Sequence, residues 1–507
     1  MMKENHSSRN DKKPAGYEEL ILRYNLLVIP NWHHSFVSTG AQHKIYQDSG
    51  VVFETYPSKY WPGETVGDHL EFAIKYDGIN LAILASLFQV IEQKKIIDYI
   101  QSKPIGKYAR RVWFLYEFIT NSILPFPDLS RGNYVDLLDS KKYYTLEVTE
   151  RVRRQRVNNN LLGNAQFCPT VRRTECLHKY EKIDFAKSCE KVISQYSPVL
   201  LRRALSYLYT KETKSSFEIE HVKPNSTRTE RFVTMLEQAE KKDFCEKQFL
   251  IDLQNQIVDP RFCDKDYRSF QNYVGESVSW QREKVHFICP KPADLPSLME
   301  GLMATHKQMD QNKLSAIVHA ATIAYGFVFL HPFEDGNGRI HRLLIHNILA
   351  RADFTPKGIM FPVSAAMLKN LQEYDLSLEA FSHPLMSLID YSLDEQGHMI
   401  VHNDTLRWYQ YIDMTVQVEA LFCFIEQTIN TELAEELTFL ANYDEAKEVL
   451  KEVVDMPDRK IDLFIRFCLQ NNFILSSRKR DKHFDFLSKK EISFMEQALR
   501  SIYGITP

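Results

Sequence analysis

Apolar residues recur at helical spacing along most of the chain, which predicts a mainly α-helical protein. Residues 79–91 carry enough apolar side chains for a buried helix. From Leu314 to Leu330 the chain runs for 17 residues without Asp, Glu, Lys or Arg. That length is at the short limit for crossing a bilayer, and the stretch includes His319 and Thr322. We therefore expect a buried core helix there, and no membrane segment.

Two segments interrupt the helical pattern. Residues 273–290 contain two β-prone runs around a polar middle and end in proline, which predicts a β-hairpin. Residues 151–160 join a basic run to three asparagines, a composition typical of loops. We expect a boundary near this second segment.

The C-terminal hundred residues or so show a different order of elements. A helix is expected to begin at Asp458, followed by a short strand at 473–477 and a basic loop at 478–483. Ser488 and Glu491 form a capping box for the last helix. Helix, short strand, basic loop and helix together resemble part of a winged-helix module.

These elements divide the chain into four parts. The parts are a disordered lead-in (1–15), a helical N-terminal region (16–150), a helical central domain with a small β-hairpin (195–395) and a helical, winged-helix-like C-terminal module (400–507).

Charge and composition narrow the classes of function. The 63 Lys and Arg nearly balance the 66 Asp and Glu, which gives a net charge of −3. This balance argues against a protein that wraps nucleic acid through bulk electrostatics. The polar start has no secretory signal, so we expect a cytoplasmic protein. The eight cysteines include no CxxC pair and are interpreted as reduced thiols.

The chemistry concentrates in the segment HPFEDGNGRIHR, residues 331–342. His331 titrates near neutrality and could act as a general base. Gly336, Asn337 and Gly338 lead directly into an apolar helical run, which predicts a glycine-rich turn at a helix N-terminus. Backbone N–H groups and the helix dipole at such a turn bind phosphate.

Charged residues complete this segment. Asp335 lies beside the expected anion site and can hold Mg²⁺ that bridges phosphates. Arg339 and Arg342 are three residues apart, so they share a helix face and can bind several phosphate oxygens. The combination indicates phosphoryl or nucleotidyl transfer, although there is no Walker loop of the form GxxxxGK[ST].

The segment resembles the signature of the Fic (Fido) family, HxFx[DE]GNGRxxR. Every specified position is filled, by His331, Phe333, Asp335, Gly336, Asn337, Gly338, Arg339 and Arg342. The resemblance extends at least from about residue 215 to residue 351, with a looser match to long bacterial Fic proteins over much of the chain. It implies a mainly α-helical Fic core in which residues 273–290 form the flap.

The resemblance also implies an activity. Fic enzymes mostly transfer AMP from ATP to a Tyr, Thr or Ser hydroxyl of a target protein and release pyrophosphate. By this match, His331 deprotonates the hydroxyl and Asp335 holds Mg²⁺. The loop of Gly336, Asn337 and Gly338, with the Asn337 side chain, forms the anion hole. Arg339 contacts the phosphates and Arg342 holds the γ-phosphate, while Phe333 anchors the loop in the core.

A second feature lies upstream, within residues 213–224. Many Fic proteins carry an inhibitory helix with the motif [ST]xxxE[GN], and this chain has Ser216 and Glu220 at that spacing, followed by His221 instead of Gly or Asn. The resemblance implies that Glu220 pairs with Arg342 and blocks the γ-phosphate. An alternative is that Ser215 and Glu218 form an ordinary capping box.

Several alternatives stay open. In some relatives the inhibitory glutamate positions water, so the enzyme could remove AMP or be bifunctional. A different class of function is a DNA-binding regulator, with the C-terminal module contacting DNA and the Fic core sensing nucleotide. Self-modification and homodimers are compatible with the resemblance. The target protein cannot be read from the sequence.

Overall fold

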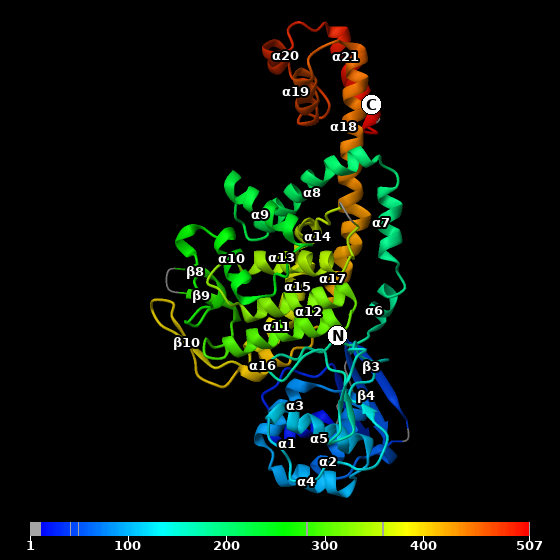
Figure 1. Cartoon of the computed structure of the whole chain (residues 1–507), viewed down its shortest axis with the longest axis vertical. Coiled ribbons are helices and arrows are strands. Elements are labelled where there is room, and N and C mark those ends of the chain that lie inside the picture. The colour runs from blue at the N-terminus through cyan, green and yellow to red at the C-terminus, as the bar shows by residue number, and fades with distance from the viewer. Residues whose placement is uncertain (1–11, 41, 49, 280–281, 357–358, 506–507) are drawn as a thin grey trace. The chain divides into compact units, whose positions relative to one another are not determined.

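The computed structural model describes residues 12–505 except 41, 49, 280–281 and 357–358, and no side chain between 277 and 283 (Figure 1). Most of the predicted lead-in, residues 1–11, lies outside these residues. The chain forms two compact units. The first contains residues 1–183, 224–354 and 370–423, and the second contains residues 184–223, 355–369 and 424–507.

The first unit begins with a lobe, residues 12–183, that we call the N-terminal lobe. It opens with a four-stranded sheet of order β1-β2-β4-β3, in which only β2 and β4 run parallel. The strands are β1 (Lys12–Ala15), β2 (His33–Ser38), β3 (Lys44–Asp48) and β4 (Val51–Pro57). The predicted helical region from residue 16 does begin with a helix, α1 (Tyr17–Tyr24), but the prediction missed strands β2 to β4, and residues 12–15 of the predicted lead-in form β1. The inward positions of β2 are His33, Ser35 and Val37, and two polar side chains among them hide the alternation that marks a strand.

Helices pack beside this sheet around one apolar core. They are α1 (Tyr17–Tyr24), α2 (Val66–Phe72), η3 (Ala73–Asp77), α3 (Leu81–Val90), α4 (Gln93–Ser102) and α5 (Lys107–Thr120). Helix α3 confirms the buried helix predicted at 79–91, and the Asn80 side chain caps its first turn. Residues 151–160, predicted as a loop, contribute to a small sheet of β5 (Val135–Asp136), β6 (Glu150–Val152) and β7 (Val157–Asn159).

The rest of the first unit is mainly helical. Helix α6 (Glu175–Tyr180) still belongs to the N-terminal lobe. The elements that follow are α9 (Ser226–Gln238), α10 (Lys247–Ile257), β8 (Tyr273–Ser279), β9 (Arg282–Ile288), α11 (Leu295–Gln311), α12 (Ala316–Leu330), α13 (Asn337–Arg351), α15 (Leu371–Met386), β10 (Tyr391–Leu393), β11 (Met399–Val401), α16 (Leu406–Gln410) and α17 (Thr415–Gln427), which continues into the second unit after residue 423. Strands β8 and β9 pair antiparallel and confirm the predicted hairpin. Helix α12 is almost wholly buried and packs against α11 and α13, as expected for a core helix (Figure 1).

The second unit is helical. It comprises α7 (Phe185–Ile193), α8 (Pro198–Glu218), α14 (Val363–Lys369), η5 (Thr428–Leu433), α18 (Ala434–Val453), α19 (Asp458–Leu469), α20 (Ser477–His483) and α21 (Lys489–Ile502). The Ser488 and Glu491 capping box is confirmed at α21.

Two predicted elements of this unit are wrong. Residues 473–477 form no strand, and the basic loop at 478–483 lies within helix α20, capped by Ser476. Leu475 packs into the apolar core around α19 and α21, so this run of apolar residues serves a helix bundle and not a sheet. Between residues 402 and 505 the structure contains helices and turns but no strand, so the β-wing of a winged-helix module has no counterpart there.

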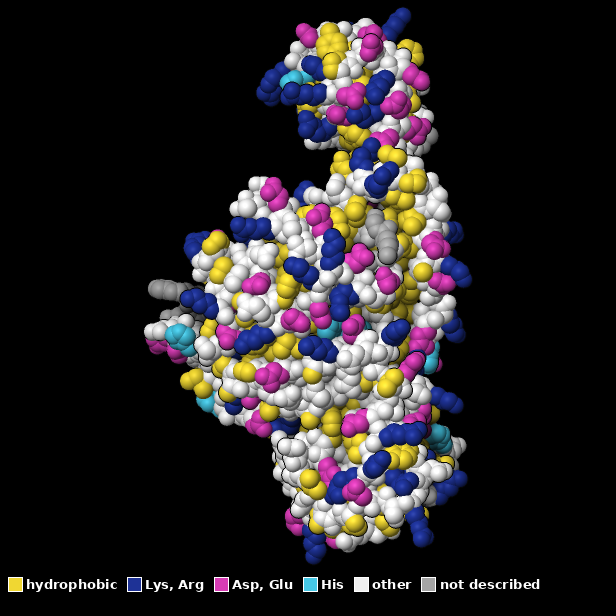
Figure 2. All heavy atoms as spheres, viewed as in Figure 1, with side chains coloured by type: hydrophobic (Ala, Val, Ile, Leu, Met, Phe, Trp, Pro, Cys, Tyr) yellow, Lys and Arg dark blue, Asp and Glu magenta, His cyan; other side chains and the backbone are white. Residues whose placement is uncertain are grey.

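Surface charge follows the balanced composition. On the face shown in Figure 2, Lys and Arg side chains are interspersed with Asp and Glu in each part of the chain. Among the described residues, no helix is long and apolar enough to cross a bilayer.

Candidate active site

The signature segment comprises the turn between the buried helices α12 and α13 and the first turns of α13. His331 follows the last residue of α12 and adopts a left-handed backbone conformation with φ of 50°. Gly336, with φ of 90°, precedes the first residue of α13. A Cβ at Gly336 would lie 3.0 Å from Val258 Cγ1, so both the conformation and the space favour glycine there. The sequence prediction of a glycine-rich turn at a helix N-terminus is confirmed.

The backbone of α12 fixes the orientation of the His331 ring. His331 Nδ1 lies 3.2 Å from the carbonyl oxygen of Val328. A carbonyl only accepts hydrogen bonds, so Nδ1 carries the proton and Nε2 is the basic nitrogen. Burial lowers the pKa of His331 to about 4, and the nearby cation of Arg268 adds to this, while Val328 and Asp335 oppose it. The imidazole is therefore neutral at pH 7 and able to accept a proton.

Asn337 holds the turn closed. Its Oδ1 accepts a hydrogen bond from Phe333 N at 3.1 Å, and its Nδ2 donates to Phe333 O at 2.8 Å. The Asn337 side chain is only 2% exposed. The family resemblance assigned this side chain to the anion hole, whereas here it bonds the turn. The Phe333 ring is fully buried and packs against Phe327 and Tyr267, which confirms its predicted anchoring role.

The charged residues of the segment lie at the start of α13. Arg339 Nη2 lies 2.6 Å from Asp335 Oδ1, and Arg339 Nη1 donates to the carbonyl oxygen of Ile257 at 3.3 Å. Arg342 Nη1 lies 3.5 Å from the Tyr374 hydroxyl. Both guanidinium groups are buried, whereas the Asp335 side chain is 47% exposed. The structure therefore brings the predicted site residues 331–342 together in one connection.

Arg268 is a residue of this site that the sequence analysis missed. Its Nε donates to the His331 carbonyl at 2.8 Å, Nη1 to Phe270 O at 2.8 Å, and Nη2 to Pro290 O at 2.7 Å. Its backbone N–H donates to Pro332 O at 2.8 Å. Arg268 is 4% exposed and joins the end of α12 to the base of the hairpin. No sequence signal marked it, because its partners are backbone carbonyls and not side chains.

A second carboxylate approaches the turn. Asp264 Oδ2 accepts a hydrogen bond from the Glu334 N–H at 3.2 Å and from Gln254 Nε2 at 3.2 Å. Burial raises the pKa of Asp264, and the charge of Asp335 adds to this effect. Asp264 lies 71 positions before Asp335 in the sequence, so only the fold relates the two.

This arrangement fits a hard divalent cation. Asp335 is 47% exposed just before the first residue of α13, and Asp264 brings a second acidic group whose pKa responds to it. Mg²⁺ in nucleotide sites usually uses one or two carboxylates together with phosphate oxygens.

The predicted inhibitory segment belongs to the second unit. Helix α8 begins after Ser197 and runs through residue 218, so Ser215 and Glu218 are not a capping box. Ser216 is fully buried, and Glu220 is half-buried just beyond the end of the helix. Arg342 belongs to the first unit, so the pairing of Glu220 with Arg342 stays a prediction.

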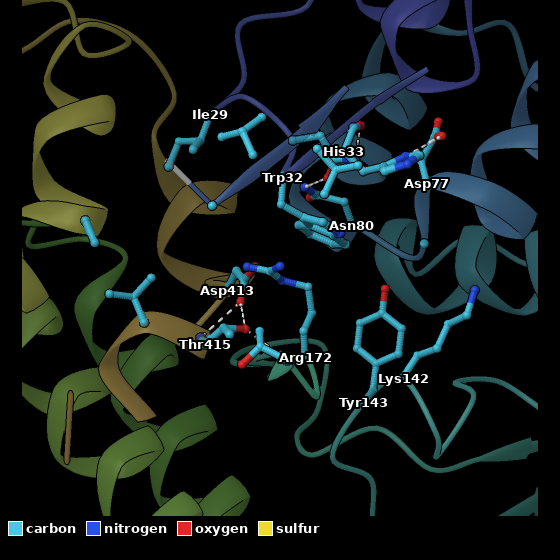
Figure 3. Close-up of a pocket in the computed structure, with 18 of the residues that line it drawn as sticks. Ile29, Trp32, His33, Asp77, Asn80, Lys142, Tyr143, Arg172, Asp413 and Thr415 are labelled. Carbon is cyan, nitrogen blue, oxygen red and sulfur yellow. Dashed lines mark hydrogen bonds and ion pairs between the residues drawn. The ribbon is translucent and has the colours of Figure 1, made fainter. Parts of the chain in front are cut away.

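A cavity of the first unit lies away from this segment. It has a volume of about 760 Å³ and is lined by residues of the N-terminal lobe and of segments 380–381 and 408–419. Trp32, Asn80 and His33 face Arg172, Asp413 and Tyr143 across it (Figure 3). Arg172 packs on the Trp32 ring at 4.6 Å and bonds Asp413 at 2.9 Å. None of the residues that line this cavity belongs to the segment 331–342.

Comparisons with known proteins locate the family within the chain. The model of the Fic/DOC family matches residues 244–349. The chain is 39% identical over 95 residues to "Protein adenylyltransferase Fic" of Nematostella vectensis, which is 19% of this chain and 20% of that protein. It is 36% identical over 91 residues to the protein of the same name from Drosophila grimshawi, covering 18% of this chain and 17% of that one. The match thus spans about a fifth of these relatives.

Two solved structures are also similar. A Fic family protein from Desulfovibrio desulfuricans G20 aligns with 66% of this chain and 86% of its own at a TM-score of 0.34 and 17% identity. A Fic domain containing signaling protein from Bacteroides thetaiotaomicron VPI-5482 aligns with 50% of this chain and 96% of its own at a TM-score of 0.36 and 19% identity. The match of the family model, together with the similarity to the Nematostella vectensis and Drosophila grimshawi proteins, shows that the chain contains a domain of the Fic/DOC family at residues 244–349.

Proposed function

We propose that this protein is a Fic-type protein adenylyltransferase, which transfers AMP from ATP to a Tyr, Thr or Ser hydroxyl of a target protein or of itself. The observation that carries the proposal is the His331 ring, whose Nδ1 is bound to Val328 O and whose Nε2 is basic. This base lies in one short connection with a carboxylate and with the first turn of α13. The curated relatives matched by this domain are named adenylyltransferases.

The proposed reaction balances without a further reactant. Nε2 of His331 takes the proton of the target hydroxyl, and the hydroxyl oxygen attacks the α-phosphorus of ATP. The bond from the α-phosphorus to the oxygen that bridges to the β-phosphate breaks, and pyrophosphate leaves. The N–H groups of the first turn of α13 have no acceptors within the helix and bind phosphate oxygens together with Arg339 and Arg342.

Asp335, with Asp264 near it, would hold Mg²⁺ in this proposal. The ion would neutralise part of the phosphate charge. Asp335 Oδ1 is paired with Arg339 Nη2 in this structure, so Asp335 would hold the ion in place of Arg339, and Arg339 would be available to the phosphates. Both side chains therefore have two partners in the reaction cycle.

Inhibition by the segment around Ser216 and Glu220 is a further part of the proposal. A carboxylate paired with Arg342 would occupy the position of the γ-phosphate and hold ATP in a nonproductive pose. The half-buried Glu220 follows directly after the end of α8, where a small shift of the helix end would move it. A cytoplasmic location and a homodimer also belong to this proposal.

The test is label transfer from α-labelled and from γ-labelled ATP with Mg²⁺. The samples are the wild type, Glu220→Gly, and Glu220→Gly combined with His331→Ala. We expect protein label from α-labelled ATP only, more of it with Glu220→Gly, and a loss of at least a hundredfold without His331. The matched control combines Glu220→Gly with His383→Ala, which removes an exposed histidine of α15 and should leave transfer unchanged.

Other outcomes have defined meanings. Label from γ-labelled ATP would replace AMP transfer by phosphorylation. Release of AMP from a premodified protein, dependent on Glu220, would identify a de-AMPylating or bifunctional enzyme. If no variant is labelled although ATP binds, the proposal is overturned in favour of a nucleotide-sensing regulator. Salt-sensitive binding of duplex DNA by the full chain would then support that alternative.

A further inference from the structure

A second cavity in the N-terminal lobe is rich in cationic side chains. It has a volume of about 330 Å³ and lies between η3, the start of α5 and the segment 135–143. Its lining includes four cationic side chains, Lys75, Lys107, Arg111 and Lys142, against two acidic ones, Asp136 and Asp139. This excess of positive charge differs from the balanced charge of the whole chain.

Within the described part of the chain, none of the four cationic side chains forms a direct ion pair, although the charges of Asp139 and Asp136 act on Arg111 and favour its charged form. The two acidic groups have other partners: Asp136 accepts a hydrogen bond from Asn158, and Asp139 accepts one from the backbone N–H of Lys141. The cavity therefore offers an entering anion an excess of positive charge that no direct ion pair neutralises.

Arg111 has the most constrained position of the four. Its Nε donates to the carbonyl oxygen of Asp136 at 2.9 Å, which fixes the guanidinium plane and leaves both terminal nitrogens for another acceptor. Arg111 is half-buried, and burial lowers the pKa of its guanidinium. A partly desolvated guanidinium that has no carboxylate in direct contact is stabilised further when an anion binds it. Lys107 lies one helical turn before Arg111 in α5 and faces the same way.

We propose that this cavity binds the phosphate group of a small phosphorylated molecule, with Arg111 as the central contact and Lys75, Lys107 and Lys142 around it. A guanidinium fork suits two phosphate oxygens at once, and the excess of cations favours a dianion over a single carboxylate. The Tyr108 ring also lines the cavity, and its volume leaves room for an organic group beside the phosphate.

The experiment is isothermal titration of the full chain with inorganic phosphate and with glycerol 3-phosphate, with glycerol as the uncharged control. We expect both phosphates to bind and the affinity to fall as salt rises. Arg111→Gln should weaken binding about tenfold and Lys75→Gln about threefold, as for charge-assisted contacts of these kinds. Lys94→Gln removes an exposed lysine of α4 outside the cavity and should change nothing.

Three results would overturn this inference. Phosphate could fail to bind the wild type at millimolar concentration, or bind Arg111→Gln and Lys75→Gln as well as the wild type. Binding lost in Arg339→Gln but kept in Arg111→Gln would place the anion at the start of α13 instead. If Arg111→Gln does not fold, Lys75→Gln and Lys107→Gln carry the test, because both lysines are exposed.

Discussion

His33 of the N-terminal lobe has different surroundings from three histidines of the Fic domain, His319, His331 and His341. The lobe also contains the buried His69, whose pKa burial lowers. In the lobe, His33 Nδ1 lies 3.1 Å from Asp77 and Nε2 lies 2.8 Å from Glu54. Burial by itself lowers the pKa of His33, but the hydrogen bonds to Asp77 and Glu54 outweigh it and raise the pKa. Asp77 also accepts hydrogen bonds from Ser35 and from the Tyr17 N–H.

In the Fic domain, burial prevails. It lowers the pKa of His319 to about 3, of His331 to about 4 and of His341 to about 3. His319 bonds to His306, and the His341 ring packs edge-on against Tyr325. The comparison teaches that carboxylates bonded to the ring raise the pKa of a buried histidine, whereas burial lowers the pKa where no carboxylate bonds the ring. Only a neutral histidine can take a proton from a substrate, so the environment of His331 suits its proposed role.

The largest expected difference between the two regions is the change in their stability at acidic pH. Each of the three neutral histidines of the Fic domain binds a proton on unfolding below pH 6.5, so stability falls as pH decreases towards 4. The expected loss is about 1.4 kcal/mol per pH unit for each histidine. The contribution of His33, whose folded pKa is raised, is fully present below its unfolded pKa and is lost as pH rises through the folded value.

Amide hydrogen exchange, measured segment by segment at pH 7 and pH 4.5, tests this difference in stability between the two regions. Helices α12 and α13 should lose protection at pH 4.5, while β2 should keep it. Earlier opening of β2 than of α12 would contradict the comparison.

Asp77→Ala should cost about 3–5 kcal/mol in the free energy of unfolding, because it leaves His33 with one carboxylate and removes three hydrogen bonds. Chemical denaturation measures the loss. Asp77→Asn is the matched control, since it keeps an acceptor but no charge. It should cost less and lower the pKa of His33 in an NMR titration, and an unchanged pKa would show that Asp77 does not hold the charge.

Arg268→Met should cost about 2–3 kcal/mol, because it removes the donors to the carbonyls of His331, Phe270 and Pro290. Loss of this cation should also raise the pKa of His331. On the proposed function, the pH below which label transfer declines should then shift to a higher value. Arg268→Lys keeps the charge and loses the fork. Arg268→Lys should therefore restore the pH dependence of label transfer more fully than the free energy of unfolding. The same pH dependence in Arg268→Met and Arg268→Lys would exclude an effect of the charge.

Asn337→Asp should cost about 1–2 kcal/mol, the smallest effect of the four. The carboxylate still accepts from Phe333 N, but it cannot donate to Phe333 O. Thermal unfolding measures the loss. Asn121→Asp, at the exposed end of α5 in the lobe, is the control for added charge and should be near neutral. An equal loss of stability in Asn337→Asp and Asn121→Asp would mean that the added charge, and not the lost hydrogen bond to Phe333 O, accounts for the effect.

Predictions from the sequence succeeded where the deciding contacts are local. The glycine-rich turn at 336–338, the hairpin at 273–290 and the buried helix α12 each depend on residues that are neighbours in the chain. They failed at β2, whose partners are 19–26 residues away and whose inward face carries His33 and Ser35. They failed again at 473–477, where packing against α19 and α21 overrides strand propensity.

The sequence by itself determined the residues of the candidate site, because the twelve residues 331–342 contain the candidate base, the carboxylate, the glycine turn and both arginines. Only the tertiary structure decided how these groups are held and charged. Arg268, Asp264 and Val328 act on the connection through backbone contacts, hydrogen bonds and burial. Such contacts depend on distance in space and leave no periodicity or motif in the chain, and the same holds for the cationic cavity around Arg111.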